Sequence, residues 1–290
     1  MLYTIENNCL KVVVNSCGAE LWSIKNNDGV EFLWQGDPSY WSDRSPVLFP
    51  YIGRMIDKRY SYKENVYPMN IHGFALNMDF QIISHKENEL SLQLKSTKET
   101  KKQYPWNFIF NIKYQLMENR LQIIFNLKNN DSSEMLFAVG GHPGFRVLFV
   151  EGEKFEDYRL RFPNAEATER VIFTNECFVD HIEPYELPNG NCINLSHSLF
   201  DQDAIVLNNT GSNVILENIN GNYSVTVTYP QMPYIGFWHT PELDAPYVCI
   251  EPWSSLPSAK GEKTVWDNQK DLLKLSAGKT YENEWCITIK

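Results

Sequence analysis

The sequence predicts a mainly β protein whose strands pair antiparallel. Short segments of alternating or β-rich apolar character recur along the chain, and each has the length of one strand. Clusters such as Asn26-Asn27-Asp28-Gly29 and Asn220-Gly221-Asn222 lie between them and supply the backbone conformations that hairpin turns need. Aromatic residues form 13% of the chain, and such residues favour a pleated, half-buried surface.

The expected strands follow one another from the N-terminal to the C-terminal part of the chain. They cover residues 10–14, 80–83, 90–94, 108–114, 121–127, 204–207, 213–216, 223–229 and 285–289. Their apolar side chains alternate or form short continuous runs, which is typical of strands. The order in which these strands pair does not follow from the pattern.

Helical patterning is thin. Residues 267–275 are the best helical candidate. The expected strands do not alternate with long amphipathic helices, so the pattern does not indicate a parallel sheet. The chain has 290 residues, which is long for one domain, but large all-β sandwiches and barrels reach this length. No Pro/Gly/Ser-rich linker, low-complexity tract or repeat divides it. We therefore expect a single β domain over residues 1–290.

Composition and charge exclude several classes of partner. The formal net charge is −10 and no block of Lys and Arg occurs, so we expect neither nucleic acid nor an anionic membrane as a partner. Residues 1–15 do not have the basic start and apolar stretch of a signal peptide, and no apolar run of about eighteen residues follows. The six cysteines are scattered without a CxxC pair. These features favour a cytoplasmic protein with reduced thiols.

Two histidines stand where glycine and proline interrupt the strand pattern. His72 precedes Gly73, which permits close approach of backbone and ligand, and Arg54 offers fixed donors for oxygen atoms. His142 follows two glycines and precedes a proline, so stiff backbone holds its side chain. Histidine can both give and accept a proton near neutrality because its unperturbed pKa is about 6.5.

Glu251 is the third candidate for chemistry. It closes an apolar run, residues 247–250, and is flanked by Pro252 and Trp253. Apolar surroundings raise the pKa of a carboxyl group, which suits a general base. Each candidate also has a structural alternative: a turn or core position for the histidines, a surface ion pair for Arg54, and capping of backbone donors for Glu251.

Motifs for other chemistries are missing from the sequence. His72, His142 and His239 have no HxH or HExxH spacing, so no zinc site is indicated. The chain also has no GxSxG elbow, no GxxxxGK[ST] loop and no GxGxxG fingerprint, which hydrolases, P-loop proteins and dinucleotide enzymes need. The functions that remain are catalysis by proton transfer and binding without catalysis.

With these residues in place, the chain resembles the aldose 1-epimerase family over nearly its whole length. The matching motifs are Cys17-Gly18-Ala19-Glu20-Leu21-Trp22-Ser23-Ile24, Phe49-Pro50-Tyr51-Ile52-Gly53-Arg54, His72-Gly73-Phe74, Gly141-His142-Pro143, Asp203-Ala204-Ile205-Val206-Leu207 and Ile250-Glu251-Pro252-Trp253. Each motif is short, but their order makes the combination specific. The resemblance implies a galactose mutarotase-like fold, a large antiparallel β-sandwich (a supersandwich) with few short helices.

The resemblance also implies a reaction, the interconversion of sugar anomers. Glu251, as a carboxylate, would remove the proton of the anomeric hydroxyl while protonated His142 donates to the ring oxygen, and the ring opens. Rotation beside the aldehyde carbon and reclosure then deliver the other anomer. Neither a metal nor a redox cofactor is needed for this chemistry.

Substrate-binding residues are implied in the same way. Arg54, His72 and Asp203 would hold sugar hydroxyls, and Trp238 is a candidate for stacking on the sugar ring. Asp201, two residues earlier, is an alternative to Asp203. These assignments follow from the resemblance and not from spacing.

The substrate stays open at this point. The His-Gly-Phe form at residues 72–74 is similar to a branch that includes hexose-6-phosphate epimerases and relatives near sugar operons. A hexose-6-phosphate 1-epimerase is therefore the alternative enzyme, and a non-catalytic sugar-binding or regulatory module is the alternative outside catalysis. The sequence also leaves open whether the chain forms a homodimer.

Overall fold

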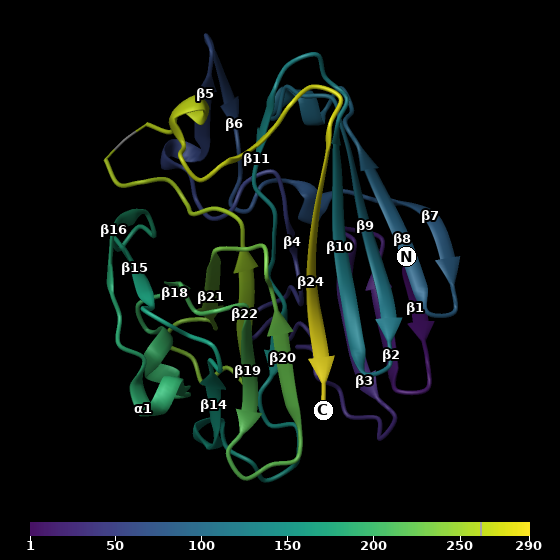
Figure 1. The fold of residues 1–290 in the computed structure, drawn as a ribbon, viewed down its shortest axis with the longest axis vertical. Coiled ribbons are helices and arrows are strands. Elements are labelled where there is room, and N and C mark those ends of the chain that lie inside the picture. Colours follow the sequence, from purple (N-terminus) through teal and green to yellow (C-terminus); the bar gives the residue numbers. More distant parts are fainter. Residues whose placement is uncertain (262) are drawn as a thin grey trace.

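The computed structural model describes residues 1–261 and 263–290, and antiparallel strands are its main regular elements (Figure 1). One large sheet has nine strands. Its order in space is β17 (Cys192–Asn194), β14 (Tyr158–Arg161), β19 (Asn213–Asn218), β20 (Ser224–Thr228), β24 (Thr280–Ile289), β10 (Arg120–Asn129), β9 (Phe108–Met117), β8 (Glu89–Lys95) and β7 (Gln81–Lys86).

A second large sheet has eight strands, most of them shorter. Its order is β16 (Val179–Pro184), β15 (Glu169–Phe173), β18 (Ile205–Asn208), β21 (Tyr234–Trp238), β22 (Tyr247–Trp253), β12 (Gly140–Gly141) and β4 (Val47–Leu48), and β13 (Gly144–Arg146) also pairs with β22. The pairings are antiparallel in both large sheets.

Smaller elements surround the two large sheets. They are a sheet of β1 (Leu2–Glu6), β2 (Leu10–Asn15) and β3 (Glu20–Asn26), two ribbons formed by β5 (Arg59–Tyr62) with β6 (Asn65–Pro68) and by β11 (Met135–Phe137) with β23 (Leu273–Leu275), one short helix α1 (Pro188–Asn191), and the 3₁₀ turns η1 (Ile56–Lys58), η2 (Ala75–Asn77), η3 (Thr100–Lys102), η4 (Phe155–Asp157), η5 (His197–Phe200) and η6 (Trp266–Asn268). Each of the nine expected strand segments overlaps an observed strand, so the prediction of a mainly antiparallel β fold is confirmed.

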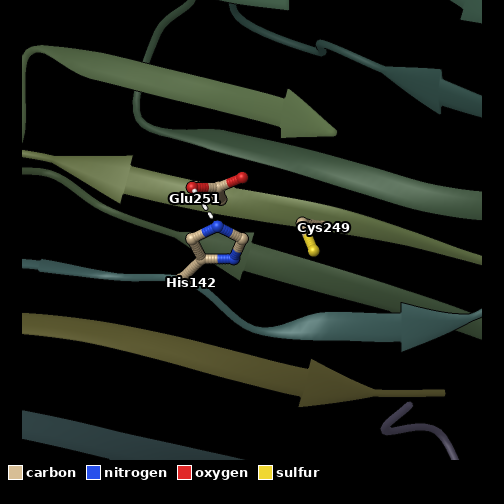
Figure 2. A group of neighbouring side chains, drawn as sticks. All are labelled: His142, Cys249 and Glu251. Carbon is tan, nitrogen blue, oxygen red and sulfur yellow. Dashed lines mark ion pairs between the residues drawn. The ribbon is translucent and has the colours of Figure 1, made fainter. Parts of the chain in front are cut away.

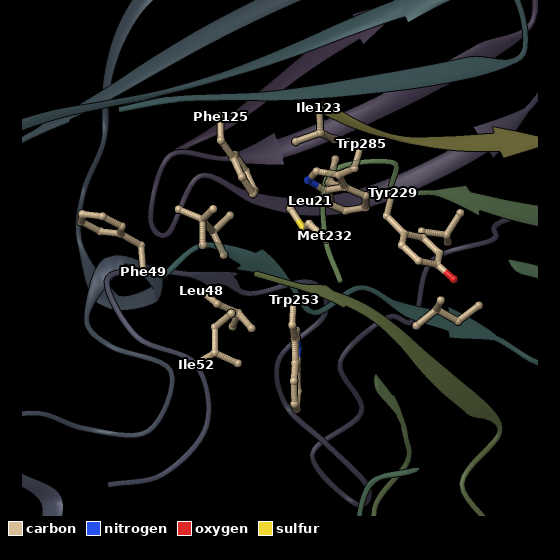
Figure 3. Close-up of a cluster of buried hydrophobic side chains, with 14 of the residues drawn as sticks. Leu21, Leu48, Phe49, Ile52, Ile123, Phe125, Tyr229, Met232, Trp253 and Trp285 are labelled. Carbon is tan, nitrogen blue, oxygen red and sulfur yellow. The ribbon is translucent and has the colours of Figure 1, made fainter. Parts of the chain in front are cut away.

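The core contains apolar side chains from both large sheets. Ile123, Phe125 and Trp285 of the nine-stranded sheet and Leu48 and Ile250 of the eight-stranded sheet belong to one buried cluster, part of which Figure 3 shows. Burial of this apolar surface is the main favourable contribution to folding. The cluster fixes the eight-stranded sheet, and the candidate site is built on that sheet.

The prediction of a helix at residues 267–275 is wrong. Its first part is only the 3₁₀ turn η6, and its last part is strand β23, which pairs antiparallel with β11. A helix of nine residues is marginal by itself, so pairing and burial of Leu275 prevail over the local pattern. None of the helices in residues 1–261 and 263–290 has the length and hydropathy that a membrane crossing requires.

Candidate active site

A cavity of about 450 Å³ lies against the eight-stranded sheet. All six residues that the sequence singled out for the site line it, although they come from distant segments of the chain. They are Arg54, His72, His142, Asp203, Trp238 and Glu251. Asp201, the alternative to Asp203, is exposed and is not among the described residues that line the cavity.

Strand β22 brings Glu251 to the cavity wall. Successive side chains of a strand point to opposite faces, so Cys249, Glu251 and Trp253 share the face opposite to Val248 and Ile250, and Glu251 and Trp253 line the cavity. Both faces of β22 are covered, and Glu251 is only 1% exposed. The chain therefore carries a carboxyl group into a nearly dry environment.

The glycines before His142 are required by close packing. A Cβ atom on Gly141 would lie 2.6 Å from the Trp285 ring, and one on Gly140 would lie 2.8 Å from the carbonyl oxygen of Pro252. Only glycine fits such close approaches without displacing its neighbours. The backbone N–H of His142 then donates to the carbonyl of Pro46 at 3.0 Å, which fixes where the imidazole begins.

His142 and Glu251 are in direct contact. Nε2 of His142 lies 3.2 Å from Oε2 of Glu251, and the dashed line in Figure 2 marks this ion pair. The indole Nε1–H of Trp253 donates to the same carboxylate oxygen, also at 3.2 Å. The imidazole packs against the Trp41 ring, with centroids 5.0 Å apart, and this packing fixes the plane of the imidazole.

Burial sets the protonation of this pair. It raises the pKa of Glu251 well above its ordinary value, and it lowers the pKa of His142 well below its ordinary value, with the neighbouring His72 adding to the second effect. Desolvation favours the neutral form of each group. Between the two displaced pKa values the pair holds one proton, which is the stoichiometry that an acid and a base acting together need.

His72 faces the cavity beside this pair, with its ring centroid 5.3 Å from that of His142. Its Nδ1 accepts a hydrogen bond from the backbone N–H of Gly53 at 3.2 Å, which assigns the ring hydrogen to Nε2. Burial, and then the charge of Arg54, lower the pKa of His72 to about 4. At neutral pH His72 is therefore an uncharged donor.

Asp203 lines another part of the cavity and is held from two sides. Its Oδ1 accepts from the backbone N–H of Ala204 and its Oδ2 accepts from the thiol of Cys177, both at 2.9 Å. Burial, and then this hydrogen bond, raise the pKa of Cys177 to about 11, so the thiol remains a donor at neutral pH. Arg54 lies at the exposed mouth and is the one Lys or Arg among the described residues that line the cavity.

Cys249 completes a cluster with the pair that Figure 2 draws. The candidate ligand atoms of His142, Cys249 and Glu251 lie within 4.8 Å of one another. The set fits a metal ion poorly. Burial raises the pKa of the Cys249 thiol well above its ordinary value, and Nδ1 of His142 has no hydrogen-bond partner among the described residues. A metal-bound histidine normally donates its second ring N–H to an acceptor.

Comparison with known proteins identifies the family. The model of the aldose 1-epimerase family matches residues 1–269. The chain belongs to the aldose 1-epimerase family. Its fold is similar to that of a galactose mutarotase related enzyme from Lactobacillus acidophilus, with 33% identity, a TM-score of 0.95, and coverage of 100% of this chain and 97% of that chain.

Two further proteins are similar to this chain over its whole length. A galactose mutarotase-like protein from Lactobacillus casei ATCC 334 is 29% identical with a TM-score of 0.94, and 100% of both chains is covered. The plasmid-encoded protein LacX of Lactococcus lactis subsp. lactis is 29% identical over 299 residues, which covers 100% of this chain and 99% of that protein. The expected galactose mutarotase-like β-sandwich is therefore confirmed.

Several residues that line this cavity have no signal in the sequence. Trp41, Asp43 and Cys177 line the cavity, yet each stands in an ordinary turn or loop segment. Trp253 belongs to the motif around Glu251, but its contact with the carboxylate depends on the strand conformation. Only the tertiary fold brings these side chains to the same cavity.

Proposed function

We propose that the chain is an aldose 1-epimerase that interconverts the α and β anomers of an unphosphorylated hexose. The single observation that supports this most is the 3.2 Å contact between Nε2 of His142 and Oε2 of Glu251 on the wall of the cavity. The ring oxygen and the anomeric hydroxyl of a hexose are bonded to the same carbon, so an acid and a base that act on both must also be neighbours.

The proposed reaction moves two protons and consumes none. Glu251, as a carboxylate, takes the proton of the anomeric hydroxyl, and protonated His142 gives its proton to the ring oxygen as the bond from that oxygen to the anomeric carbon breaks. Rotation about the bond beside the aldehyde carbon presents its other face. Closure with the roles reversed forms the opposite anomer and restores both groups. Each positioned transfer contributes about 10²–10⁴-fold in rate.

The other polar groups of the cavity position the sugar in this proposal. The Nε2–H of His72 donates to a hydroxyl, and the carboxylate of Asp203 accepts from one. The indoles of Trp41 and Trp238 lie beside His142 and offer apolar faces to the sugar ring. Such positioning brings the ring oxygen to the acid and the hydroxyl to the base.

Charge in the cavity favours a neutral substrate over a phosphorylated one. Phosphate is commonly bound by arginines that donate in pairs. Among the described lining residues Arg54 is the one cationic side chain, and Asp43 and Asp203 also line the cavity. A hexose 6-phosphate would therefore meet more negative than positive charge.

A substrate panel tests this proposal. Polarimetry or NMR of freshly dissolved α-glucose and α-galactose should show equilibration faster than in buffer, and glucose 6-phosphate should react more slowly than glucose. A faster reaction with the phosphate would reassign the substrate. Saturable sugar binding by calorimetry without rate enhancement on any sugar would instead favour a non-catalytic binding module.

A further inference from the structure

We propose that Trp253 is a positioning residue that holds Glu251 in its base form by donating the indole hydrogen to the carboxylate. The hydrogen bond itself rests on geometry alone, whereas its kinetic consequence rests on the proposed function. The sequence places Trp253 in the motif around Glu251 but assigns it no contact with the carboxylate.

The strand places the two side chains side by side. Residues 251 and 253 share one face of β22, and Nε1 of Trp253 reaches back to Oε2 of Glu251 at 3.2 Å. Trp253 is 4% exposed and Glu251 is 1% exposed, so water scarcely competes for this bond. His142 contacts the same oxygen, Oε2. Oε2 is thus held between two nitrogens, and we assign Oε1 to the anomeric hydroxyl.

A glycine on the neighbouring strand gives the indole its position. Gly236 of β21 pairs with Glu251. A Cβ atom on Gly236 would lie 3.3 Å from the Trp253 ring and 3.4 Å from Cβ of Glu251. Because that position carries no side chain, the ring can lie along the sheet toward residue 251.

The groups around Glu251 leave the indole a distinct electrostatic role. His142 faces it from the loop after β12, Asp203 from the turn before β18, and Cys249 from the same strand. Burial raises the pKa of Glu251, and Asp203 adds to this, while the hydrogen bond from Trp253 lowers it. The indole does not titrate, so it stabilises the carboxylate at every pH.

The rate law turns this role into a measurable signature. The productive pair has Glu251 ionised and His142 protonated, whereas burial raises the pKa of Glu251 and lowers that of His142 and so favours the neutral form of each group. We infer from these two directions that the pKa of Glu251 lies above that of His142 in the folded protein. Activity is then constant between the two pKa values, falls on the acid side with the pKa of His142, and falls on the alkaline side with that of Glu251. Loss of a donor to the carboxylate raises only the second pKa.

Trp253→Phe removes the indole N–H and keeps an aromatic ring. We expect the plateau of kcat to fall about tenfold and the alkaline limb to move up by about one pH unit, so that the two profiles converge at high pH. The matched control is Trp266→Phe. Trp266 is also buried, and its Nε1–H also donates at 3.2 Å, but to the carbonyl of Leu136. Trp266→Phe should lower the free energy of unfolding about as much as Trp253→Phe does, but it should not move either limb of the pH profile of kcat.

Each kinetic outcome decides the proposal. A limb of the pH profile that moves to higher pH in Trp253→Phe, and not in Trp266→Phe, supports the proposal. If the limb that moves is the acid one, ionised Glu251 with protonated His142 is the main form of the pair in the resting enzyme. A uniform loss of rate with both limbs in their original places would overturn it.

A readout that does not need activity separates this inference from the proposed function. In ¹H–¹⁵N spectra of the wild type, the indole resonance of Trp253, assigned with Trp253→Phe, should shift as Glu251 titrates and should stop shifting in Glu251→Gln. If the resonance titrates while no sugar is epimerised, the proposed function fails and the hydrogen bond stands. A Trp253 resonance that ignores pH in the wild type would overturn the inference.

Discussion

The two large sheets differ in how their side chains are buried. Along β9 and β10 of the nine-stranded sheet, buried and half-exposed residues alternate almost without exception. Along β22 of the eight-stranded sheet every residue is buried. The nine-stranded sheet therefore has an apolar face and a wet face, whereas the eight-stranded sheet is covered on both faces at β22, where Glu251 lies.

This difference separates stability from chemistry. Alternating burial lets the nine-stranded sheet place apolar side chains in the core at no electrostatic cost. Full coverage of β22 removes Glu251 from water, which penalises its charged form and supplies the displaced pKa that acid and base catalysis uses. Truncation of core residues in the nine-stranded sheet should therefore lower stability more than activity, and substitution of Glu251 on β22 should lower activity more than stability.

The largest expected effect on activity comes from Glu251→Gln. The variant keeps the shape of the side chain and an acceptor for Trp253 but cannot take a proton, so kcat should fall about 10²–10⁴-fold. His142→Asn should cost a similar factor, and the double variant little more than the worse single one, because the two groups act as a unit. Polarimetry measures these rates. Additive losses would contradict the pairing.

Glu251→Gln should have the opposite effect on stability. The folded-state pKa of Glu251 is raised by burial, so the stability that this group contributes is complete below its ordinary pKa of 4.5 and is lost as pH rises through the folded value. The variant should therefore be at least as stable as the wild type at neutral pH, with the difference vanishing below pH 4.5. Urea denaturation at several pH values measures this, and a less stable variant at neutral pH would contradict it.

Leu92→Ala should have the reverse effect of Glu251→Gln, because it should lower stability and leave activity unchanged. Leu92 of β8 is 0% exposed on the core face of the nine-stranded sheet, so truncation should lower the free energy of unfolding by about 2–5 kcal/mol. The residue does not line the cavity, so kcat of the folded fraction should stay near the wild-type value. Urea denaturation and steady-state kinetics measure the two quantities. A large loss of kcat without loss of stability would break the division between the sheets.

The pH dependence of kcat should reveal the dry setting of β22. Because burial lowers the pKa of His142 and raises that of Glu251, activity should be flat over a broad range and fall about tenfold per pH unit outside it. The acid limb should lie below the ordinary value of 6.5 for histidine, and the alkaline limb above the ordinary 4.5 for glutamate. A narrow optimum between 4.5 and 6.5 would mean that neither pKa is displaced.

The smallest effect concerns Cys177, which holds Asp203 by a hydrogen bond. Cys177→Ala should raise KM for the sugar about threefold, and Cys177→Ser, which keeps a donor, should restore most of it. Asp203→Ala removes the acceptor itself and should raise KM more. If Cys177→Ala still changes KM in the Asp203→Ala background, the thiol acts in some other way.

The same contrast explains what the sequence could predict. Strands such as β9 and β10 alternate in burial, so their period is visible in the residues. The short strands β4, β12 and β13 contain too few residues to show a period. Residues 267–275 have a helix-like pattern, but their last part forms β23, which pairs with β11. His142 and Glu251 stood out because Gly, Pro and Trp surround them. Cys177 and Asp43 did not, because ordinary turns carry them to the cavity.

Exchange NMR on an equilibrated hexose tests the central claim most directly. At equilibrium, magnetisation passes between the α and β anomeric signals only if the ring opens and closes. We expect exchange for the wild type beyond that in buffer, and exchange near the buffer level for folded His142→Asn and Glu251→Gln. Wild-type exchange no faster than buffer with every sugar that binds, or undiminished exchange in both variants, would contradict it.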